Sequence, residues 1–168
     1  LIHKGKSSDV GSELQSMLQA LKHRGPDSTG YALYADNDGQ NFIMRFKVGE
    51  NVGEGSTSIN EDESVYDERK KLVDKKLSDL GAIVVKDERL TPYSFRYEIK
   101  YNKDLMEFSK AIEGVEMVEI LSIGKSLELI KDLGDAKTVS ERYGLNKVKG
   151  THGIGHARMA TESGVDIK

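Results

Sequence analysis

The chain has 168 residues, of which 37% are apolar, and its 25 basic and 28 acidic residues give a formal net charge of -3. This apolar content supports a hydrophobic core. The length favours one domain, with two domains as the alternative. Because the basic residues are spread along the chain, we expect no nucleic-acid partner. No segment approaches the about 18 uninterrupted apolar residues of a membrane helix, and the start is too polar for a signal peptide. We therefore expect a cytoplasmic protein without membrane association.

Cysteine is absent from the sequence, and both ends are abrupt. Its absence excludes disulfides, thiolate metal sites and a cysteine nucleophile within these 168 residues. The sequence opens on Leu1 and closes on Lys168 without a turn, a cap or a polar tail, so we expect a fragment or trimmed termini.

The chain begins with a predicted helix and a predicted hairpin. Residues 12–25 carry apolar side chains at the spacing of one helical face, with Ser12 and Gln15 as a capping box and Gly25 as the stop. Residues 31–49 predict a β-hairpin, because two β-prone runs flank an Asn-Asp-Gly turn.

A second group of elements follows residues 51–64, whose glycines, serines and acids predict a loop and a boundary. Residues 65–80 predict an amphipathic helix ended by Gly81, residues 82–85 a short buried strand, and residues 94–101 a half-exposed strand. The remaining predicted elements are a helix at 104–114, strands at 115–123 and 126–134, a helix at 138–144 with Thr138 and Glu141 as its capping box, and a strand at 153–161. This mixed order favours an α+β architecture.

Two patterns suggest ligand sites that their surroundings do not support. Residues 124–126 resemble the end of a Walker A loop, but Glu119 stands where its first glycine belongs. His152 and His156 have the spacing of a helical zinc pair, but the glycines around them argue against a helix. We therefore expect neither a nucleotide site nor a metal site.

Two other motifs are stronger candidates for a functional site. The first is LKHRGPDSTG, residues 21–30. Pro26 fixes its backbone φ, and the polar side chains that follow can bond back onto turn amides. A capped helix-to-strand turn therefore accounts for each residue type except Arg24.

The second motif is GTHGIGHARMATESG, residues 150–164. An extended backbone places His156 and Arg158 on one face, and Arg158 is the only cation of the predicted strand. A guanidinium can bind a carboxylate through two parallel hydrogen bonds, which makes Arg158 a candidate anchor for a carboxylate ligand. An ion pair with a local acid, Glu162 or Asp166, is an equally weighted alternative.

The two motifs in this order resemble the paired signatures of class II glutamine amidotransferase domains, which are N-terminal-nucleophile hydrolases that release ammonia from glutamine. The residue sequences of both motifs most resemble those of the stand-alone glutaminase domain of archaeal-type glutamate synthases. The resemblance implies a four-layer αββα sandwich with a glutaminase core at 1–50 and 116–168. Residues 51–115 would then be an inserted α+β block, either a docking or regulatory surface or an inert decoration.

The resemblance also implies residue roles. The arginine of the second motif would bind the α-carboxylate of glutamine, and its neighbours would line the same pocket. The implied substrate contacts are Arg158, Thr161 and Met159, and the implied active-site supports are Arg24, Asp27 and His156.

The family nucleophile is an N-terminal cysteine, which this sequence lacks. Residues 1–5 resemble the continuation of the strand that carries it, and the oxyanion-hole groups of the family lie downstream of the second motif. We therefore expect these 168 residues to be catalytically silent by themselves. An intact parent would pass ammonia to a synthase, for which glutamate synthase is the expected case. The flavin and iron–sulfur cluster of that enzyme would reside on the synthase partner, and no cofactor is expected in this domain. The alternative is a non-catalytic glutamine-binding or regulatory module that kept Arg158.

Overall fold

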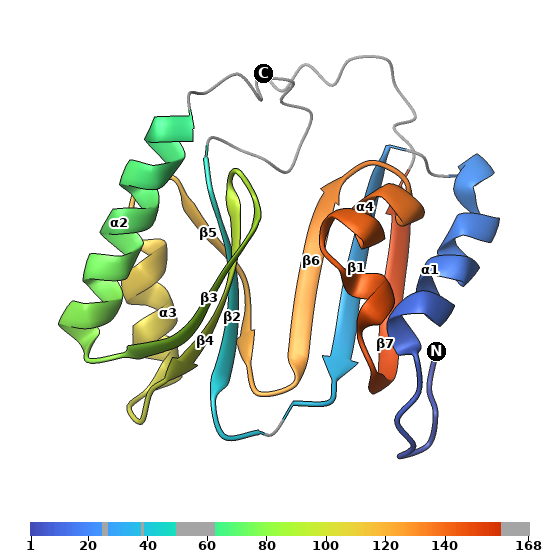
Figure 1. The fold of residues 1–168 in the computed structure, drawn as a ribbon, viewed down its shortest axis with the longest axis horizontal. Helices are drawn as coiled ribbons and strands as arrows, with labels where there is room; N and C mark the ends of the chain where they lie inside the picture. Colours follow the sequence, from blue (N-terminus) through green and yellow to red (C-terminus); the bar gives the residue numbers. More distant parts are fainter. Residues whose placement is uncertain (25–26, 38, 50–62, 159–168) are drawn as a thin grey trace. The chain divides into compact units, whose positions relative to one another are not determined.

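The structure is a computed structural model that describes residues 1–24, 27–37, 39–49 and 63–158. It confirms the α+β class, because helices combine with two antiparallel sheets (Figure 1). The chain divides into two compact units. The first contains the described residues of Leu1–Asp36 and those from Ile130 to Arg158, and the second contains the described residues between Asn37 and Leu129. Within the described ranges, no helix is long and apolar enough to cross a membrane.

The first unit is built on a three-stranded sheet with the order β6-β1-β7. Helix α1 packs against β7 and α4 lies beside β1, so two helices cover the sheet (Figure 1). The elements are α1 (Val10–Ala20), η1 (Lys22–Arg24), β1 (Ser28–Ala35), β6 (Leu127–Leu133), α4 (Ala136–Arg142), η2 (Leu145–Lys147) and β7 (Gly150–Arg158).

The second unit is built on a four-stranded sheet with the order β3-β4-β2-β5. Its elements are β2 (Phe42–Val48), α2 (Glu63–Leu80), β3 (Ile83–Thr91), β4 (Ser94–Lys100), α3 (Leu105–Glu113) and β5 (Val118–Gly124). The predicted alternation is confirmed over residues 95–100, because Phe95, Tyr97 and Ile99 are fully buried, but Ser94 of the predicted exposed face is also buried. The ring of Phe46 packs 5.2 Å from that of Phe95 and 4.9 Å from that of Tyr97, which places an aromatic cluster at the centre of this core.

Both predicted capping boxes are wrong. Asp9 precedes α1, and Ser12 lies inside its first turn, where the hydroxyl donates to the Asp9 carbonyl at 3.2 Å. Asp135 caps α4 by accepting the Thr138 N–H at 2.8 Å. In each case an aspartate three residues earlier occupies the N-cap, a position that favours a short acceptor side chain. The predicted stop at Gly25 lies outside the described residues.

The predicted hairpin at 31–49 is also wrong. Both strands form, but β1 pairs with β7 whereas β2 pairs with β4 and β5, so the two strands belong to different sheets. Gly39 has the positive φ of 70° that the turn signal predicts. The turn signal is local and says nothing about the distant strands that complete each sheet.

The predicted buried strand at 82–85 is instead the start of a longer edge strand. Among the described strands β3 pairs with β4 alone, and Ile83 and Val85 are 63% and 49% exposed. The apolar run therefore begins an edge strand that is exposed on both faces, because Val84 is 38% exposed as well. Helix α2 and Gly81 agree with prediction, although Leu72 of the predicted apolar stripe is exposed and Tyr66 is buried in its place.

The inserted block at 51–115 and the four-layer sandwich stay predictions. Most of the predicted loop, residues 51–62, lies outside the described residues. Strands β2 and β5, which flank the predicted block in sequence, share one sheet with β3 and β4 from inside it.

Candidate functional site

The structure places the two motifs side by side in the first unit. Strands β1 and β7 pair antiparallel, with Ser28 opposite Arg158 and Gly30 opposite His156. The N–H of Asp27 donates to the carbonyl of Arg158 at 3.3 Å. Three of the predicted site residues, Asp27, His156 and Arg158, therefore meet at one end of this strand pair.

The predicted alternation of the second motif is confirmed over the described part of β7. Ile154, His156 and Arg158 are exposed, whereas the residues between them are less accessible. A Cβ at Gly155 would lie 2.5 Å from a methyl carbon of Leu18 in α1, so glycine is needed for the close approach of that helix. The small residues of this strand thus face α1, while Arg158 points to the other side.

Three other predicted site residues are less fully described. Arg24 is the last residue of η1, and the structure does not describe its side chain. Met159 and Thr161 lie outside the described residues, as do Glu162 and Asp166, the acids considered as alternative partners of Arg158. The roles of these residues stay predictions.

The turn between β6 and α4 supports the first motif, and sequence reasoning did not find this contact. The N–H of Gly134 donates to the Asp27 carbonyl at 3.0 Å, and the Thr29 hydroxyl donates to the Gly134 carbonyl at 2.8 Å. The hydroxyl of Tyr31 donates to the Ala136 carbonyl at 2.7 Å. The sequence signal for this turn was a glycine between a strand and an N-cap aspartate. Such a signal indicates a turn, but it does not indicate which segment the turn contacts.

The electrostatics of this region come from the turn and the buried tyrosine. The Thr138 backbone hydrogen bond holds the pKa of Asp135 below its ordinary value. Burial raises the pKa of Tyr31, and the nearby Asp135 charge adds to that rise, so Tyr31 stays a neutral hydrogen-bond donor. Among the described residues, no group of three or more His, Cys, Asp or Glu side chains could hold a metal ion.

The N-terminal segment forms a short antiparallel ladder beside β7. The Leu1 nitrogen donates to the Gly153 carbonyl at 3.1 Å, and the Gly153 N–H donates back at 3.1 Å. The N–H of His3 donates to the Thr151 carbonyl at 2.8 Å, and Ile2 lies opposite His152. This segment therefore runs along β7 on the side away from β1.

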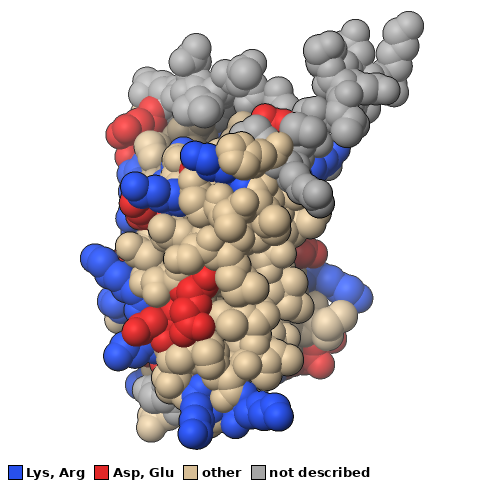
Figure 2. Space-filling model, turned by 90° about the vertical axis from the view of Figure 1, so that its right-hand side faces the viewer, with Lys and Arg blue, Asp and Glu red and all other residues tan. Residues whose placement is uncertain are grey.

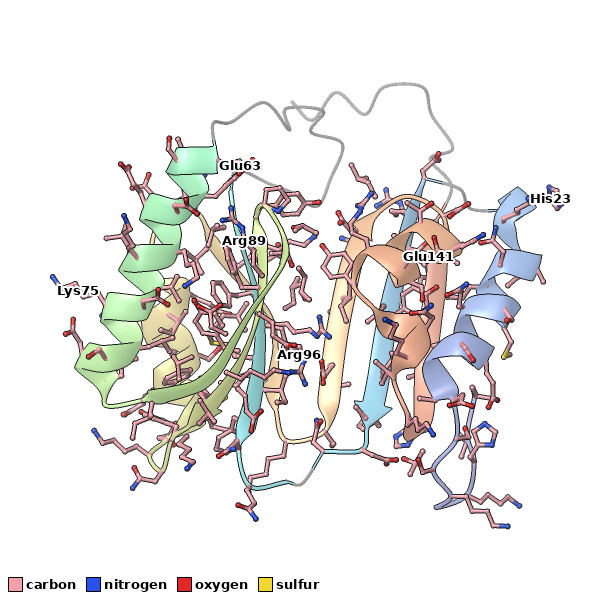
Figure 3. All side chains as sticks on the ribbon, in the orientation of Figure 1. His23, Glu63, Lys75, Arg89, Arg96 and Glu141 are labelled. Atoms are coloured by element: carbon pink, nitrogen blue, oxygen red, sulfur yellow. The ribbon has the colours of Figure 1, made fainter. Side chains whose placement is uncertain are left out.

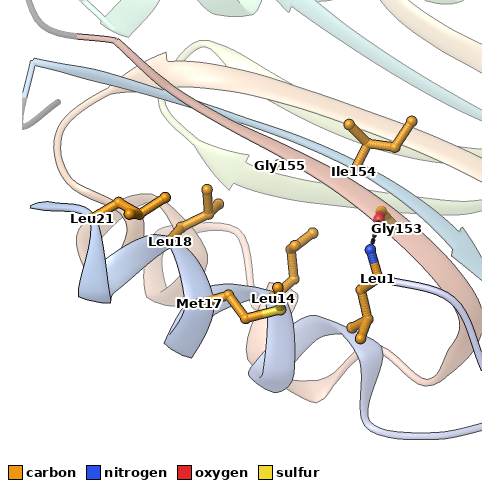
Figure 4. Close-up of a pocket in the computed structure, with 8 residues that line it drawn as sticks. All are labelled: Leu1, Leu14, Met17, Leu18, Leu21, Gly153, Ile154 and Gly155. Atoms are coloured by element: carbon orange, nitrogen blue, oxygen red, sulfur yellow. Dashed lines mark hydrogen bonds between the residues drawn. The ribbon is translucent and has the colours of Figure 1, made fainter. Parts of the chain in front are cut away.

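An apolar pocket of about 500 Å³ lies between α1 and β7 (Figure 4). Two of its lining residues, Met17 and Ile154, are 53% and 67% exposed. Uncharged side chains occupy most of the face on the α1 side, and Lys and Arg lie mainly toward its edges (Figure 2). The lining residues are Leu1, Leu14, Met17, Leu18, Leu21, Gly153, Ile154 and Gly155.

Two curated proteins are similar in sequence to this chain over nearly its whole length. No protein-family model matches the chain. A protein of Methanothermobacter thermautotrophicus named "Putative glutamine amidotransferase" is 32% identical over 169 residues, which cover 96% of this chain and 50% of the relative. The "Glutamine amidotransferase-like protein GlxB" of Rhizobium meliloti is 28% identical over 156 residues, covering 93% of this chain and 46% of the relative. The chain is therefore related to glutamine amidotransferase-like proteins, and it spans about half the length of these relatives.

Proposed function

We propose that the chain is the glutamine-binding part of a class II glutamine amidotransferase with the N-terminal-nucleophile hydrolase fold. The observation that carries this proposal is the antiparallel pairing that sets Ser28 opposite Arg158 and joins the two motifs. The names of the relatives agree with glutamine as the substrate.

In this proposal the guanidinium of Arg158 binds the α-carboxylate of glutamine. Its exposed position at the end of β7 leaves it accessible to a ligand, and its planar fork matches the two carboxylate oxygens. Met159 and Thr161 follow it and contact the amino-acid end of the substrate. Asp27 and Arg24 support this arrangement from the segment before β1, and His156 supports it from β7 itself.

The ladder at the N-terminal segment suggests where a nucleophile would stand in a longer protein. Ile2 lies opposite His152, and each step back along this segment advances one residue along β7. Six steps from that pair reach Arg158, so the fifth residue before Leu1 would lie opposite Arg158. A cysteine at that place would meet a glutamine whose carboxylate is held by the arginine.

The proposed reaction is the hydrolysis of glutamine to glutamate and ammonia. The cysteine sulfur attacks the side-chain amide carbon, and the nitrogen leaves as ammonia after taking up a proton. Water then hydrolyses the thioester, which releases glutamate and restores the thiol. The ammonia passes to a synthase, for which we propose glutamate synthase, and that partner would hold the flavin and iron–sulfur cluster.

A second candidate is a glutamine-binding or regulatory module without catalysis. The observation that favours it is the absence of cysteine from all 168 residues. It predicts carboxylate binding at Arg158 without covalent chemistry.

Labelling of the full-length protein by an electrophilic glutamine analogue separates the two candidates. We expect one covalent adduct per chain, located by peptide mass spectrometry on a cysteine about five residues before Leu1. Glutamine should protect that cysteine from labelling. A control compound with the same electrophilic group but without the α-amino and α-carboxylate groups should react far more slowly. The absence of a cysteine at that place, or labelling that glutamine does not slow, would refute the catalytic proposal and leave the binding module.

A further inference from the structure

The β6–α4 turn and the carboxylate-binding end of β7 are joined through a single residue of the first motif. The carbonyl of Asp27 accepts from Gly134, and its N–H donates to the carbonyl of Arg158. Asp27 therefore connects the turn to the last described rung of the β1–β7 ladder. The turn and the backbone of Arg158 therefore contact the two peptide groups of one residue, beside the ladder pairing of Ser28 with Arg158.

Thr29 is the side chain that fixes the turn to this strand. It is 1% exposed, and its hydroxyl donates to the Gly134 carbonyl at 2.8 Å. Gly134 has a φ of 117°, which favours glycine, so the direction of its peptide groups is set by an unusual backbone conformation. The Thr29 hydroxyl and the Gly134 N–H thus close a ring of two hydrogen bonds between the motif and the turn.

We propose that Thr29 is a positioning residue for glutamine binding. Through Gly134 and Asp27 it sets the backbone position of Arg158 and so the place of the guanidinium that receives the substrate carboxylate. This inference rests on the proposed function, because Arg158 matters to substrate only if glutamine binds there. It assigns a role in recognition to a buried threonine that does not touch the substrate.

The test compares Thr29→Val, which keeps the shape and removes the donor, with Thr29→Ser, which keeps the donor. In the full-length protein we expect Thr29→Val to raise KM for glutamine about fivefold or more with kcat within about twofold, since ground-state and transition-state binding fall together. Thr29→Ser should restore KM to within about twofold of the natural protein. Thr91→Val is the matched control, because Thr91 is 8% exposed and its hydroxyl has no hydrogen-bond partner in the described part of the chain.

Amide hydrogen exchange of the peptide that contains Asp27 gives a readout that does not depend on catalysis. We expect faster exchange at Asp27 in Thr29→Val and natural rates in Thr29→Ser and Thr91→Val. An unchanged KM together with unchanged exchange in Thr29→Val would overturn the positioning role, as would a loss of kcat at constant KM. If the natural protein binds and hydrolyses no glutamine, the proposed function fails and the proposed role in recognition falls with it. Faster exchange would then show only that the turn holds Asp27.

Discussion

Glu128 lies in the first residues of β6, which belong to the second unit, and it is the most deeply buried acid of an ion cluster with Arg45, Arg96 and Glu88. It is 4% exposed and accepts hydrogen bonds from Arg45 at 2.7 Å and from Arg96 at 2.8 and 2.9 Å. Arg96 projects from the face of its sheet that lies away from α2 (Figure 3). Burial raises the pKa of Glu128, but the Arg96 hydrogen bond and the Arg45 charge outweigh it, so the pKa lies below its ordinary value.

The lowered pKa of Glu128 predicts a pH-dependent contribution to stability. A carboxylate whose pKa is depressed on folding contributes fully above its unfolded pKa of about 4.3 and progressively less as the pH falls through the folded value. We expect Glu128→Gln to lower the free energy of unfolding by about 3–5 kcal/mol at pH 7, because both arginines lose their buried partner.

Urea unfolding at a series of pH values measures this effect. The difference between Glu128→Gln and the natural protein should shrink below about pH 4.3, while the exposed Glu116→Gln should differ little at any pH. A difference that stays constant from pH 7 to pH 3 would show that the charge of Glu128 does not stabilise the fold.

Helix α3 and helix α1 give a matched pair of N-caps. The Asp104 side chain accepts the N–H groups of Met106 at 2.7 Å and Glu107 at 2.9 Å, whereas Asp9 makes no side-chain cap hydrogen bond. We expect Asp104→Ala to cost about 1 kcal/mol of unfolding free energy and Asp9→Ala less than about 0.5 kcal/mol. Chemical denaturation of the two variants compares them, and equal losses would contradict the assignment of the caps.

At the scale of elements, local sequence patterns predicted which helices and strands form, but they could not predict which strands pair with one another. The alternation of residues 94–101 and the glycines at 81 and 114 located a strand and two helix ends, because these signals depend on neighbours in sequence. The hairpin failed because the partners of β1 and β2 lie far along the chain. The link from Thr29 to Gly134 escaped prediction for the same reason.

At the scale of the whole molecule, the candidate site is assembled from segments near both ends of the chain. The residues of the second motif indicated Arg158 as a carboxylate anchor, whereas a capped turn already explained Asp27, whose site role came only from the family resemblance. Their pairing across β1 and β7 required the structure. The chain spans about half the length of the relatives, so we propose that the activity be tested in the full-length protein.

Steady-state glutamine hydrolysis by the full-length protein carrying Arg158→Lys tests the central claim most directly. A lysine keeps the charge but cannot make the two parallel hydrogen bonds, so kcat/KM for glutamine should fall more than about tenfold, mainly through KM. Arg89→Lys is the control, since Arg89 pairs with Asp67 in the second unit and should leave the kinetics unchanged. Natural kinetics in Arg158→Lys would contradict the account, because Arg158 would then not be the anchor of the substrate.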